Sequence, residues 1–546
     1  MSGLTKSGSV ELGDKTAKLV TLFNPFLKRP AVLFYLALLL SACFKIALLD
    51  SRELWLDETY SAFAANLHFP DLIRYTAGDV HPPLFYILLW AWVRIVGDAQ
   101  TQLRLFSVVL SICSTLGVFF SAQRLLGTRF GAFAAALFAL SPMLFVYSLE
   151  VRMYMLSTLV FICLLNVHWV VAESEAKWPL VAYSALAALL FYVHYIAVFI
   201  LIGFFADWAI ASRFARKRIE RVCAAGILTI VLVCPGIPVL LKQRAQKARQ
   251  DLARELSYRD PNSLAFGVGK QNSTGTSGIK ILVKDAAAMA GFYPATSPFL
   301  LLLCAAPLIV VLVGVGFLWL VKGDEICRLF GLVMLVVAVG VLALNLYGTR
   351  YLLPVVPLLV LALARVVQYW TATGRRQTTG LAIGTLILSL YGAGFFRQAL
   401  MHHRRPWQNL VSVLQKNYQP GDKVIFDALY SQVPFDYFAG RLHFQPQENG
   451  FPLSIYEWWN EQAFKGWGGP VIMQSDLDRF VSRLSASGSK TLWLVLYETH
   501  YYDPHDALLA RLRQLGLATE VHFLPERDTG ASQDDQTMRL IRISLN

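Results

Sequence analysis

Two adjacent carboxylates, Asp57 and Glu58, stand shortly after the first long apolar stretch of the chain, and His81 follows them directly before Pro82 and Pro83. Aromatic and aliphatic residues surround these groups. An unpaired, ionised carboxylate in apolar surroundings beside a membrane costs free energy, so such a carboxylate is usually there for a function. A carboxylate in a pocket can take the proton of an acceptor hydroxyl, and a second one can orient the reacting groups. We therefore predict that Asp57 or Glu58 is a general base.

The same residues also have structural interpretations. Asp57 and Glu58 can cap a helix that runs to Asn66, because carboxylates favour helix N-termini. His81 precedes two prolines, which break one helix and start the next, so His81 can simply mark a helix start. In the functional interpretation, His81 donates a hydrogen bond to a phosphate or a sugar.

Further polar residues lie where predicted apolar segments end. Glu150 and Arg152 are two residues apart, so they do not share a helix face, but a turn there can aim both into one cavity. Tyr192, His194 and Tyr195 form another cluster, which is also typical of the aromatic belt of membrane proteins.

Arg350, followed by Tyr351, begins a third cluster of this kind. The guanidinium group offers a planar fork that matches phosphate oxygens, so Arg350 is a candidate phosphate clamp. The alternative is an arginine that reaches to lipid headgroups.

The composition indicates the class of protein to which the chain belongs. Of the 546 residues, 56% are hydrophobic and 16% are charged. Apolar runs of about 20 residues recur and match the ~30 Å thickness of a hydrocarbon core. We predict a polytopic α-helical membrane protein. The net charge of +13 gathers in short loops, so it predicts topology and contact with anionic lipids or phosphate-bearing substrates, and not nucleic acid.

Charge in the short loops predicts the orientation of the spans. The strongest basic cluster, at 213–221, should be cytoplasmic, as should residues 1–29. The apolar segment 83–97 is short and carries Arg94, and a crossing there would move the basic clusters outside. We therefore predict that 50–100 is an external segment with interfacial or re-entrant helices. Eleven spans are predicted, at 30–49, 101–122, 130–148, 154–171, 178–192, 195–211, 222–241, 299–320, 328–346, 351–369 and 380–397.

Two other external regions are predicted. Segment 242–298 is basic at first and then rich in Gly, Ser and Asn. From residue 398 to the end the pattern changes to that of a small α/β domain: a helix at 407–417, a turn at 420–422, a helix at 505–515, and strands at 423–426, 491–497, 518–524 and 538–545. With eleven spans this domain is external. None of the seven Cys lies in the long polar segments, which argues against a disulfide framework or a Cys-based metal site.

Taken in order, these motifs resemble the bacterial relatives of the dolichyl-phosphate-mannose–protein mannosyltransferases, within the GT-C superfamily of membrane glycosyltransferases. The resemblance covers roughly residues 30–400. It rests on the Asp57-Glu58 pair, His81-Pro82-Pro83-Leu84-Phe85-Tyr86, Ser141-Pro142 before Glu150-Val151-Arg152-Met153-Tyr154, His194-Tyr195, and Arg350-Tyr351-Leu352-Leu353-Pro354.

The resemblance implies a sugar donor carried on a polyprenyl monophosphate and transfer on the periplasmic face. It implies that Asp57 or Glu58 is the base. The donor phosphate is assigned to Arg350, with Tyr351, Arg152 and His81 as further candidates. Sugar or acceptor binding is assigned to a remaining set of polar residues: Asp79, Glu150, His194 and Tyr195. The C-terminal domain does not resemble a β-trefoil, so the acceptor can be a glycan, a glycolipid or a protein.

The sequence thus predicts a GT-C type protein with about 11 transmembrane helices at 30–397, a cytoplasmic tail at 1–29 and a periplasmic α/β domain at 398–546. The predicted activity is inverting sugar transfer at the bacterial inner membrane, with no cofactor and no assigned metal site; metal dependence stays open. The alternatives are a transporter or flippase of lipid-linked sugars, which would carry ionisable residues nearer the bilayer midplane, and a non-catalytic envelope assembly protein.

Overall fold

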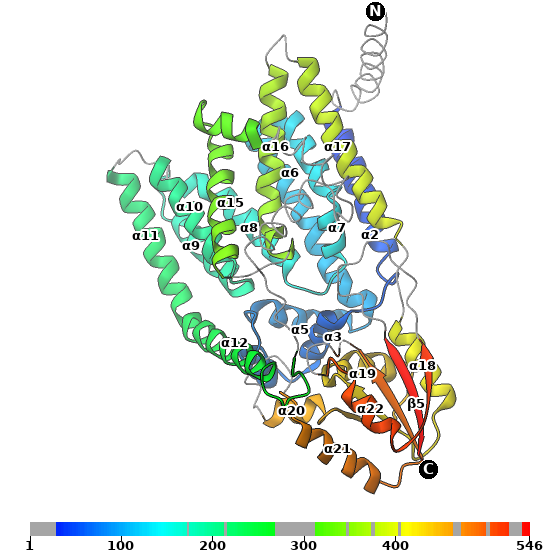
Figure 1. Ribbon diagram of the computed structural model, residues 1–546. Helices are drawn as coiled ribbons and strands as arrows, with labels where there is room; N and C mark the ends of the chain where they lie inside the picture. The colour runs from blue at the N-terminus through cyan, green and yellow to red at the C-terminus, as the bar shows by residue number, and fades with distance from the viewer. Residues whose placement is uncertain are drawn as a thin grey trace, which may run out of the picture. The chain divides into compact units, whose positions relative to one another are not determined.

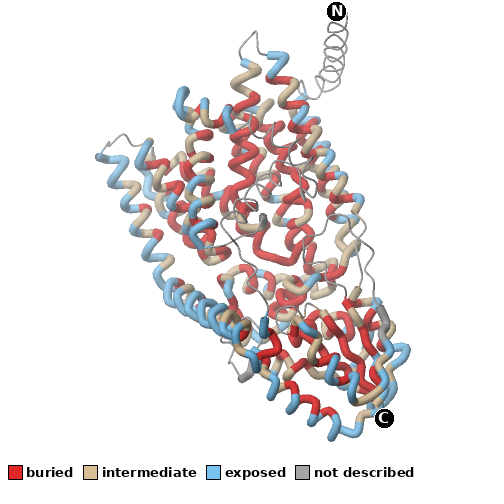
Figure 2. The backbone as a smooth tube through the Cα atoms, viewed as in Figure 1, coloured by how far each residue is buried: buried red, intermediate tan, exposed pale blue. Residues whose placement is uncertain are grey.

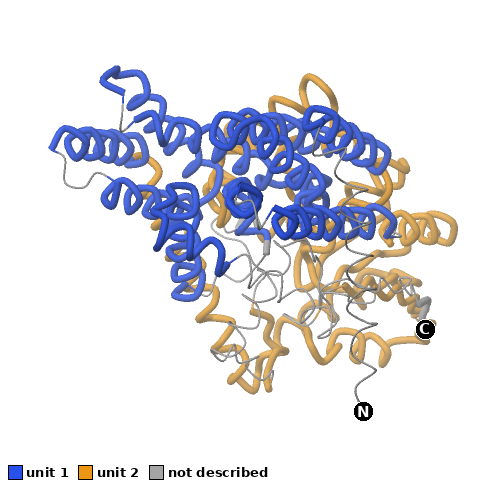
Figure 3. Tube along the Cα trace, turned by 90° about the horizontal axis from the view of Figure 1, so that it is seen from above, with its two compact units in different colours: residues 1–49, 104–234, 273–401 blue, residues 50–103, 235–272, 402–546 orange. Residues whose placement is uncertain are grey.

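The computed structural model describes residues 29–171, 174–211, 216–267, 312–344, 349–372, 377–401, 406–461, 471–497, 499, 503–522 and 538–545. The chain forms two compact units, coloured separately in Figure 3. The first takes in residues 1–49, 104–234 and 273–401, and the second takes in residues 50–103, 235–272 and 402–546.

The first unit is built from apolar helices (Figure 1). Within it α8 contacts α9, α9 contacts α11, α10 contacts α15, and α16 contacts α17. Figure 2 shows that α16 is buried along most of its length, as expected for a helix with apolar residues all round. The helices are α2 (Pro30–Ala47), α6 (Gln100–Ala139, of which the part from Arg104 on belongs to this unit), α7 (Pro142–Ser148), α8 (Tyr154–Val171), α9 (Trp178–Val193), α10 (Ala197–Ala211), α11 (Arg216–Val233), α15 (Glu325–Ala343), the 3-10 helix η2 (Thr349–Val355), α16 (Val356–Ala372) and α17 (Gln377–Ala399).

The predicted membrane-spanning class is confirmed. Among the described residues, seven helices are long and apolar enough to cross a membrane, whereas about eleven spans were predicted. The difference has three sources. Helices α9 and α10 have only 16 and 15 residues, most of the predicted span 299–320 lies outside the described residues, and the spans predicted at 101–122 and 130–148 fall mainly on α6. Gly127 interrupts α6 with a φ of 75°, a left-handed conformation that glycine adopts at no steric cost.

The second unit contains three short helices from the segment 50–103. They are α3 (Leu56–Asn66), α4 (Phe69–Gly78) and α5 (Leu84–Val96). At ~1.5 Å per residue, the 13 residues of α5 reach about 20 Å, which is short of the ~30 Å of a bilayer core. The unit also contains α12 (Ile237–Ser257), which the 3-10 helix η1 (Cys234–Gly236) joins to α11 in the chain.

A mixed sheet organises the C-terminal part of the second unit. Its strands are β1 (Lys423–Asp427), β2 (Gln447–Gly450), β3 (Thr491–Leu496), β4 (Gly516–His522) and β5 (Arg539–Leu545), in the order β2-β1-β3-β5-β4. Strand β1 is parallel to β2 and β3, and β5 is antiparallel to β3 and β4. The small α/β domain predicted from the sequence is confirmed, with β2 as a strand that was not predicted.

Helices cover both faces of this sheet. On one face, Ile425, Leu494 and Ile541 join a core with residues of α21 (Gln474–Ala486) and α22 (Ala507–Arg513). On the other face, Phe426 contacts Phe435 of α19 (Gln432–Arg441), with ring centroids 4.9 Å apart. The remaining elements are α18 (Pro406–Asn417), the 3-10 helix η4 (Leu429–Ser431) and α20 (Ile455–Glu461). Alternate strand residues thus face two apolar layers, which explains why the central strands are buried on both sides.

Candidate active site

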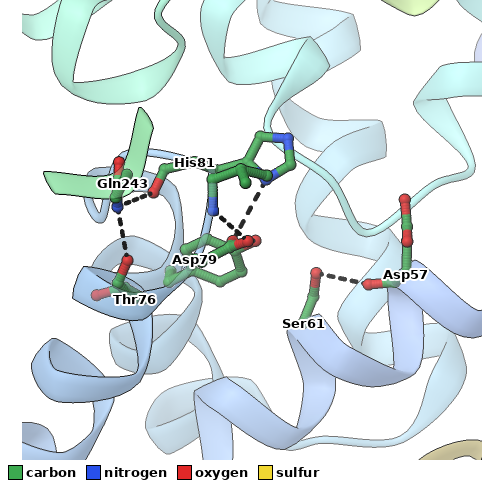
Figure 4. Close-up of polar contacts among 8 residues, drawn as sticks. Asp57, Ser61, Thr76, Asp79, His81 and Gln243 are labelled. Carbon is green, nitrogen blue, oxygen red and sulfur yellow. Dashed lines mark hydrogen bonds and ion pairs between the residues drawn. The ribbon is translucent and has the colours of Figure 1, made fainter. Parts of the chain in front are cut away.

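Helix α3 carries the two adjacent carboxylates in its first turn. Glu58 is fully buried, and its Oε2 accepts a hydrogen bond from the backbone N–H of Trp55, 3.2 Å away. Glu58 therefore caps the helix that carries it, as one of the sequence interpretations expects. Asp57 is half-buried, its carbonyl oxygen accepts a hydrogen bond from Ser61, and its carboxylate points away from α3 (Figure 4). The two carboxylates therefore lie in different surroundings.

Two buried polar side chains fix the segment that leads into α3. The carboxylate of Glu53 accepts the backbone N–H groups of Trp407 and Gln408, both at 2.8 Å, at the N-terminus of α18. The side chain of Gln100 donates to Asp50 and to the carbonyl of Arg52, and accepts from the N–H of Leu54. Residues 50–55 have no regular structure, so these five hydrogen bonds set where α3 begins. Sequence reasoning assigned no role to Glu53 or Gln100, because their partners lie far along the chain.

Asp79 organises the loop that carries His81. Its carboxylate, 1% exposed, accepts hydrogen bonds from the N–H of Val80 at 2.6 Å and from the hydroxyl of Tyr86 at 3.0 Å. The same carboxylate lies 3.3 Å from Nδ1 of His81. A carboxylate at Nδ1 favours the proton on that nitrogen and leaves Nε2 on the outward edge of the ring. Asp79, assigned from the sequence to sugar binding, is thus placed to orient His81.

Helix α12 supports the same loop from another side. The side-chain amide of Gln243 donates to the carbonyl of Thr76 at 3.0 Å and to the carbonyl of His81 at 3.5 Å. Figure 4 shows this contact and shows the imidazole of His81 extending toward the side of the view on which Asp57 is drawn. As the two prolines predict, α4 ends at Gly78 and α5 begins at Leu84, so His81 lies in the turn between them.

The other predicted site residues belong to the first unit, where a series of rings brings three sequence motifs together. The rings of Tyr154 and His194 are 6.4 Å apart, and those of His194 and Tyr351 are 5.5 Å apart. The guanidinium carbon of Arg350 lies 5.6 Å from the centroid of the Tyr351 ring, within reach of a cation–π contact. The ring of Tyr195, next to His194 in the chain, contacts that of Phe191, with ring centroids 5.3 Å apart. Clusters that are nearly 200 residues apart in sequence are therefore neighbours.

Burial and hydrogen bonds define this group further. Glu150, Arg152 and His194 are each less than 10% exposed. Nδ1 of His194 accepts the backbone N–H of Ile196 at 3.1 Å, so a neutral His194 carries its proton on Nε2. The carbonyl of Glu150 accepts hydrogen bonds from the hydroxyl of Ser107 and from the N–H of Arg152, which closes a tight turn. Such a cluster offers a cation and hydrogen-bond donors to an anionic ligand.

Two buried cations near this turn were not identified from the sequence. Lys45 of α2 is 2% exposed and donates to Ser111 of α6 at 2.8 Å. Arg104 of α6 is fully buried and donates to the carbonyl of Leu49 at 3.0 Å. A charged residue inside an apolar span is itself a signal of function, so Lys45 could have been singled out from its position in the first span.

A second group of acidic residues lies in the C-terminal part of the second unit. The hydroxyl of Tyr456 donates to Asp436, and Gln432 donates to Glu448 at 2.9 Å. Burial and the nearby Glu448 carboxylate raise the pKa of Asp436, so the pair retains a proton at neutral pH. Tyr456 also contacts Phe63 of α3, with ring centroids 5.8 Å apart. A network of buried polar groups therefore lies beside the helix that carries Asp57.

The predicted site residues are thus divided between the units. Asp57, Glu58, Asp79 and His81 belong to the second unit, and the rest belong to the first: Glu150, Arg152, His194, Tyr195, Arg350 and Tyr351.

Comparison with known proteins supports the resemblance inferred from the sequence. Residues 80–240 match the sequence model of a family described as dolichyl-phosphate-mannose-protein mannosyltransferase. No curated protein sequence matches the chain. Among solved structures, the chain is similar to ArnT from Cupriavidus metallidurans in the apo state, with a TM-score of 0.55 at 12% identity, over 93% of this chain and 97% of that one.

A second structure of the same protein, bound to undecaprenyl phosphate, has a TM-score of 0.53 at 12% identity and the same coverage of both chains. An Archaeoglobus fulgidus oligosaccharyltransferase, crystallised with Zn and sulfate, has a TM-score of 0.48 at 11% identity, over 84% of this chain and 67% of that one. The chain therefore has the GT-C fold, and the predicted similarity to GT-C glycosyltransferases is confirmed.

Proposed function

We propose that the protein is an inverting glycosyltransferase that moves a sugar from a polyprenyl monophosphate to the hydroxyl of a periplasmic acceptor. One observation carries most of this proposal: the fold matches, over 93% of the chain, that of a protein crystallised with undecaprenyl phosphate. The match of residues 80–240 to a family of sugar transferases adds to it. Both points concern relatives, so the donor, the acceptor and the stereochemistry are our inference.

Asp57 is the general base in this proposal. It is the more accessible of the two adjacent carboxylates, whereas Glu58 is buried and accepts the N–H of Trp55. The acceptor oxygen forms a bond to the anomeric carbon as Asp57 takes its proton. The bond from that carbon to the phosphate oxygen breaks, and polyprenyl phosphate leaves with the electron pair. A single displacement of this kind inverts the anomeric centre.

Arg350 stabilises the charge that develops on the leaving phosphate, with Tyr351 and Arg152 as further ligands. The ring of Tyr351 lies between Arg350 and His194 in the series described above, which limits the directions open to the guanidinium. His81, oriented by Asp79, is a further phosphate or sugar ligand. Glu150, His194 and Tyr195 bind the sugar or the acceptor.

The proposed location is the bacterial inner membrane, with the N-terminus in the cytoplasm and the C-terminal domain in the periplasm. The basic cluster at 213–221 supports this orientation because it is the strongest cluster of cations between two apolar segments. The acceptor is a glycan, a glycolipid or a protein of the cell envelope.

The direct test is reconstitution of the full chain in proteoliposomes with a panel of polyprenyl-phosphate sugars and an envelope extract. The expected result is release of polyprenyl phosphate together with a labelled acceptor, and loss of both in Asp57→Asn. A lipid-linked sugar that changes leaflet without cleavage would instead identify a flippase. Neither cleavage nor movement with any donor, in a protein that binds polyprenyl phosphate, would favour an assembly role.

A further inference from the structure

Helix α12 turns a polar face toward the rest of the second unit. Gln243 is 3% exposed and donates to the carbonyl of Thr76 in α4. Ser257, two heptads further along the helix on the same side, is also buried. Gln246 and Gln250, which share this side of the helix, are partly buried. A helix of a soluble protein normally buries its apolar stripe, so this arrangement is reversed.

The apolar stripe of α12 faces outward. Its large members are Ile237, Leu241, Leu252 and Leu256, which are 36%, 63%, 57% and 56% exposed. At 100° per residue these four side chains fall within an arc of about 100° on the helix. Exposed Ala245 and Ala248 lie on the same arc between Leu241 and Leu252. A stripe of exposed apolar residues marks an interaction surface, whereas single exposed leucines do not.

Cations border this stripe on both sides. Lys242 and Arg249 lie along one edge and Arg244 lies along the other, while Lys247 lies farther round the helix, away from the stripe, by the same helical geometry. Lys247 is paired with Asp251 at 3.3 Å. With other described residues, Lys242, Arg244 and Arg249 form no ion pair. From Ile237 to Ser257 the helix has five basic and two acidic residues, a net charge of +3.

We propose that this outward face of α12 binds the surface of the lipid bilayer. The leucines enter the boundary between headgroups and acyl chains, and the flanking Lys and Arg bind anionic headgroups. A basic helix with one apolar stripe and a polar opposite face is the pattern of an interfacial membrane helix. The position of α12 in the chain supports a bilayer as the binding partner, because α12 follows the apolar helix α11 after only the three residues of η1. The inference does not depend on the proposed transfer activity.

The binding of α12 to lipid also has a consequence for the candidate site. Gln243, on the face opposite the leucines, holds the carbonyl groups of Thr76 and His81. A helix fixed at the headgroup level on one side therefore carries the loop of His81 on the other.

The test is photo-crosslinking of the full chain in nanodiscs that contain phosphatidylglycerol. Leu252→p-benzoylphenylalanine places the probe in the stripe. Lys247→p-benzoylphenylalanine is the matched control, because its side chain is 51% exposed, close to the 57% of Leu252, and lies off the stripe. We expect lipid adducts at position 252 to exceed those at 247 by about tenfold or more, in line with burial of a leucine-sized group in acyl chains.

The charge requirement is tested in the same system. Replacing Lys242, Arg244 and Arg249 together by Glu should lower the yield of lipid adducts at position 252 by at least about fivefold. That is the factor that a single cation near an anionic surface contributes. Equal lipid adducts at 247 and 252 would overturn the proposal. So would adducts at 252 to a second copy of the chain, or an adduct yield that the charge reversal leaves unchanged.

Discussion

At the scale of single residues, the structure separates two carboxylates that the sequence presents as a pair. Glu58 is buried and caps α3, while Asp57 is half-buried on the same first turn. A general base needs its carboxylate to reach the hydroxyl of the sugar acceptor. A helix-capping residue needs only a side-chain oxygen that accepts a hydrogen bond from a backbone N–H. Substitutions that keep the shape and remove the charge therefore distinguish the two roles.

Asp57→Asn should lower the transfer rate at least ~100-fold, the usual scale for loss of a general base. Donor affinity should stay within a few-fold of wild type, because the amide keeps the volume of the side chain. Glu58→Gln keeps an oxygen for the N–H of Trp55 and should have a smaller effect. The measurement is single-turnover transfer beside equilibrium binding of polyprenyl phosphate. Near-normal turnover in Asp57→Asn, in Glu58→Gln and in the double variant would remove the base assignment.

Arg350→Ala should weaken binding of polyprenyl phosphate by ~1.5–3 kcal/mol, the range for a hydrogen bond to a charged group. Arg350→Lys should restore only part of this, because an ammonium group cannot reproduce the planar fork. Binding can be followed by native mass spectrometry of the protein with added undecaprenyl phosphate. Unchanged affinity in the alanine variant would leave Arg350 as a headgroup anchor.

The protonated pair Asp436 and Glu448 predicts a pH dependence of stability. The folded protein keeps the proton of Asp436 above the pH at which the unfolded chain, with a carboxyl pKa of about 4, has lost it. The folded state then binds more protons, so stability from this group falls as pH rises above about 4, by at most ~1.4 kcal/mol per pH unit.

Asp436→Asn should remove this dependence. The amide can accept from Tyr456 and donate to Glu448, so no proton is needed to hold the contact. Between pH 5 and 8, we expect the free energy of unfolding of the variant to depend less on pH than that of wild type, by a slope that corresponds to about one proton. At pH 8 the variant should be no less stable than wild type. Thermal unfolding measures both. A variant that keeps the wild-type pH slope, or that is destabilised at every pH, would contradict the shared proton.

At the scale of elements, α3 depends on a segment without regular structure. Glu53 accepts two buried N–H groups of α18, and replacing one carboxylate oxygen by an amide leaves one of those N–H groups facing a donor. Such a loss costs ~1–3 kcal/mol. Glu53→Gln should therefore lower the rate of transfer while leaving the KM for the donor near that of wild type.

A matched control is available in the same segment. Asp98 pairs with Arg441 of α19 at 2.9 Å, but both side chains are exposed, and such pairs contribute at most about 1 kcal/mol. Asp98→Asn should leave transfer unchanged. If both variants lower the rate to the same extent, the effect of Glu53 is general loosening of the unit and not placement of α3.

The elements also show how far sequence reasoning reaches. Strands β1, β3, β4 and β5 follow apolar patterns, and their positions were predicted to within a few residues. Strand β2 was missed because Gln447, Glu448 and Asn449 lack any apolar alternation, and only pairing with β1 makes them a strand. The periodicity of apolar residues indicates which face of a segment is buried. The conformation of β2 is instead determined by its hydrogen bonds to the neighbouring strand β1.

The candidate site shows the same limit. The sequence placed the motifs of Tyr154, His194 and Arg350 at the ends of apolar segments, but it did not predict that their side chains form one series of ring contacts. The contact of Glu53 with Trp407 spans 354 positions, and no spacing rule connects two such residues. Asp79 was assigned to sugar binding, but its orienting hydrogen bonds to Val80 and Tyr86 depend on a turn that residue types alone do not define.

At the scale of the whole molecule, the C-terminal segment and residues 50–103 form one compact unit. A chain that ends at Met401 keeps the first unit, with Arg152, His194 and Arg350, but removes the partners of Glu53 and Phe63. We expect this truncated chain to lose transfer and still bind polyprenyl phosphate, and we expect trypsin to cleave at Arg74 faster than in the full chain. Size-exclusion chromatography establishes that the truncated protein is folded. Because the proposed base lies in the segment that loses its support, a folded truncation that transfers sugar to its natural acceptor at the normal rate would refute this dependence.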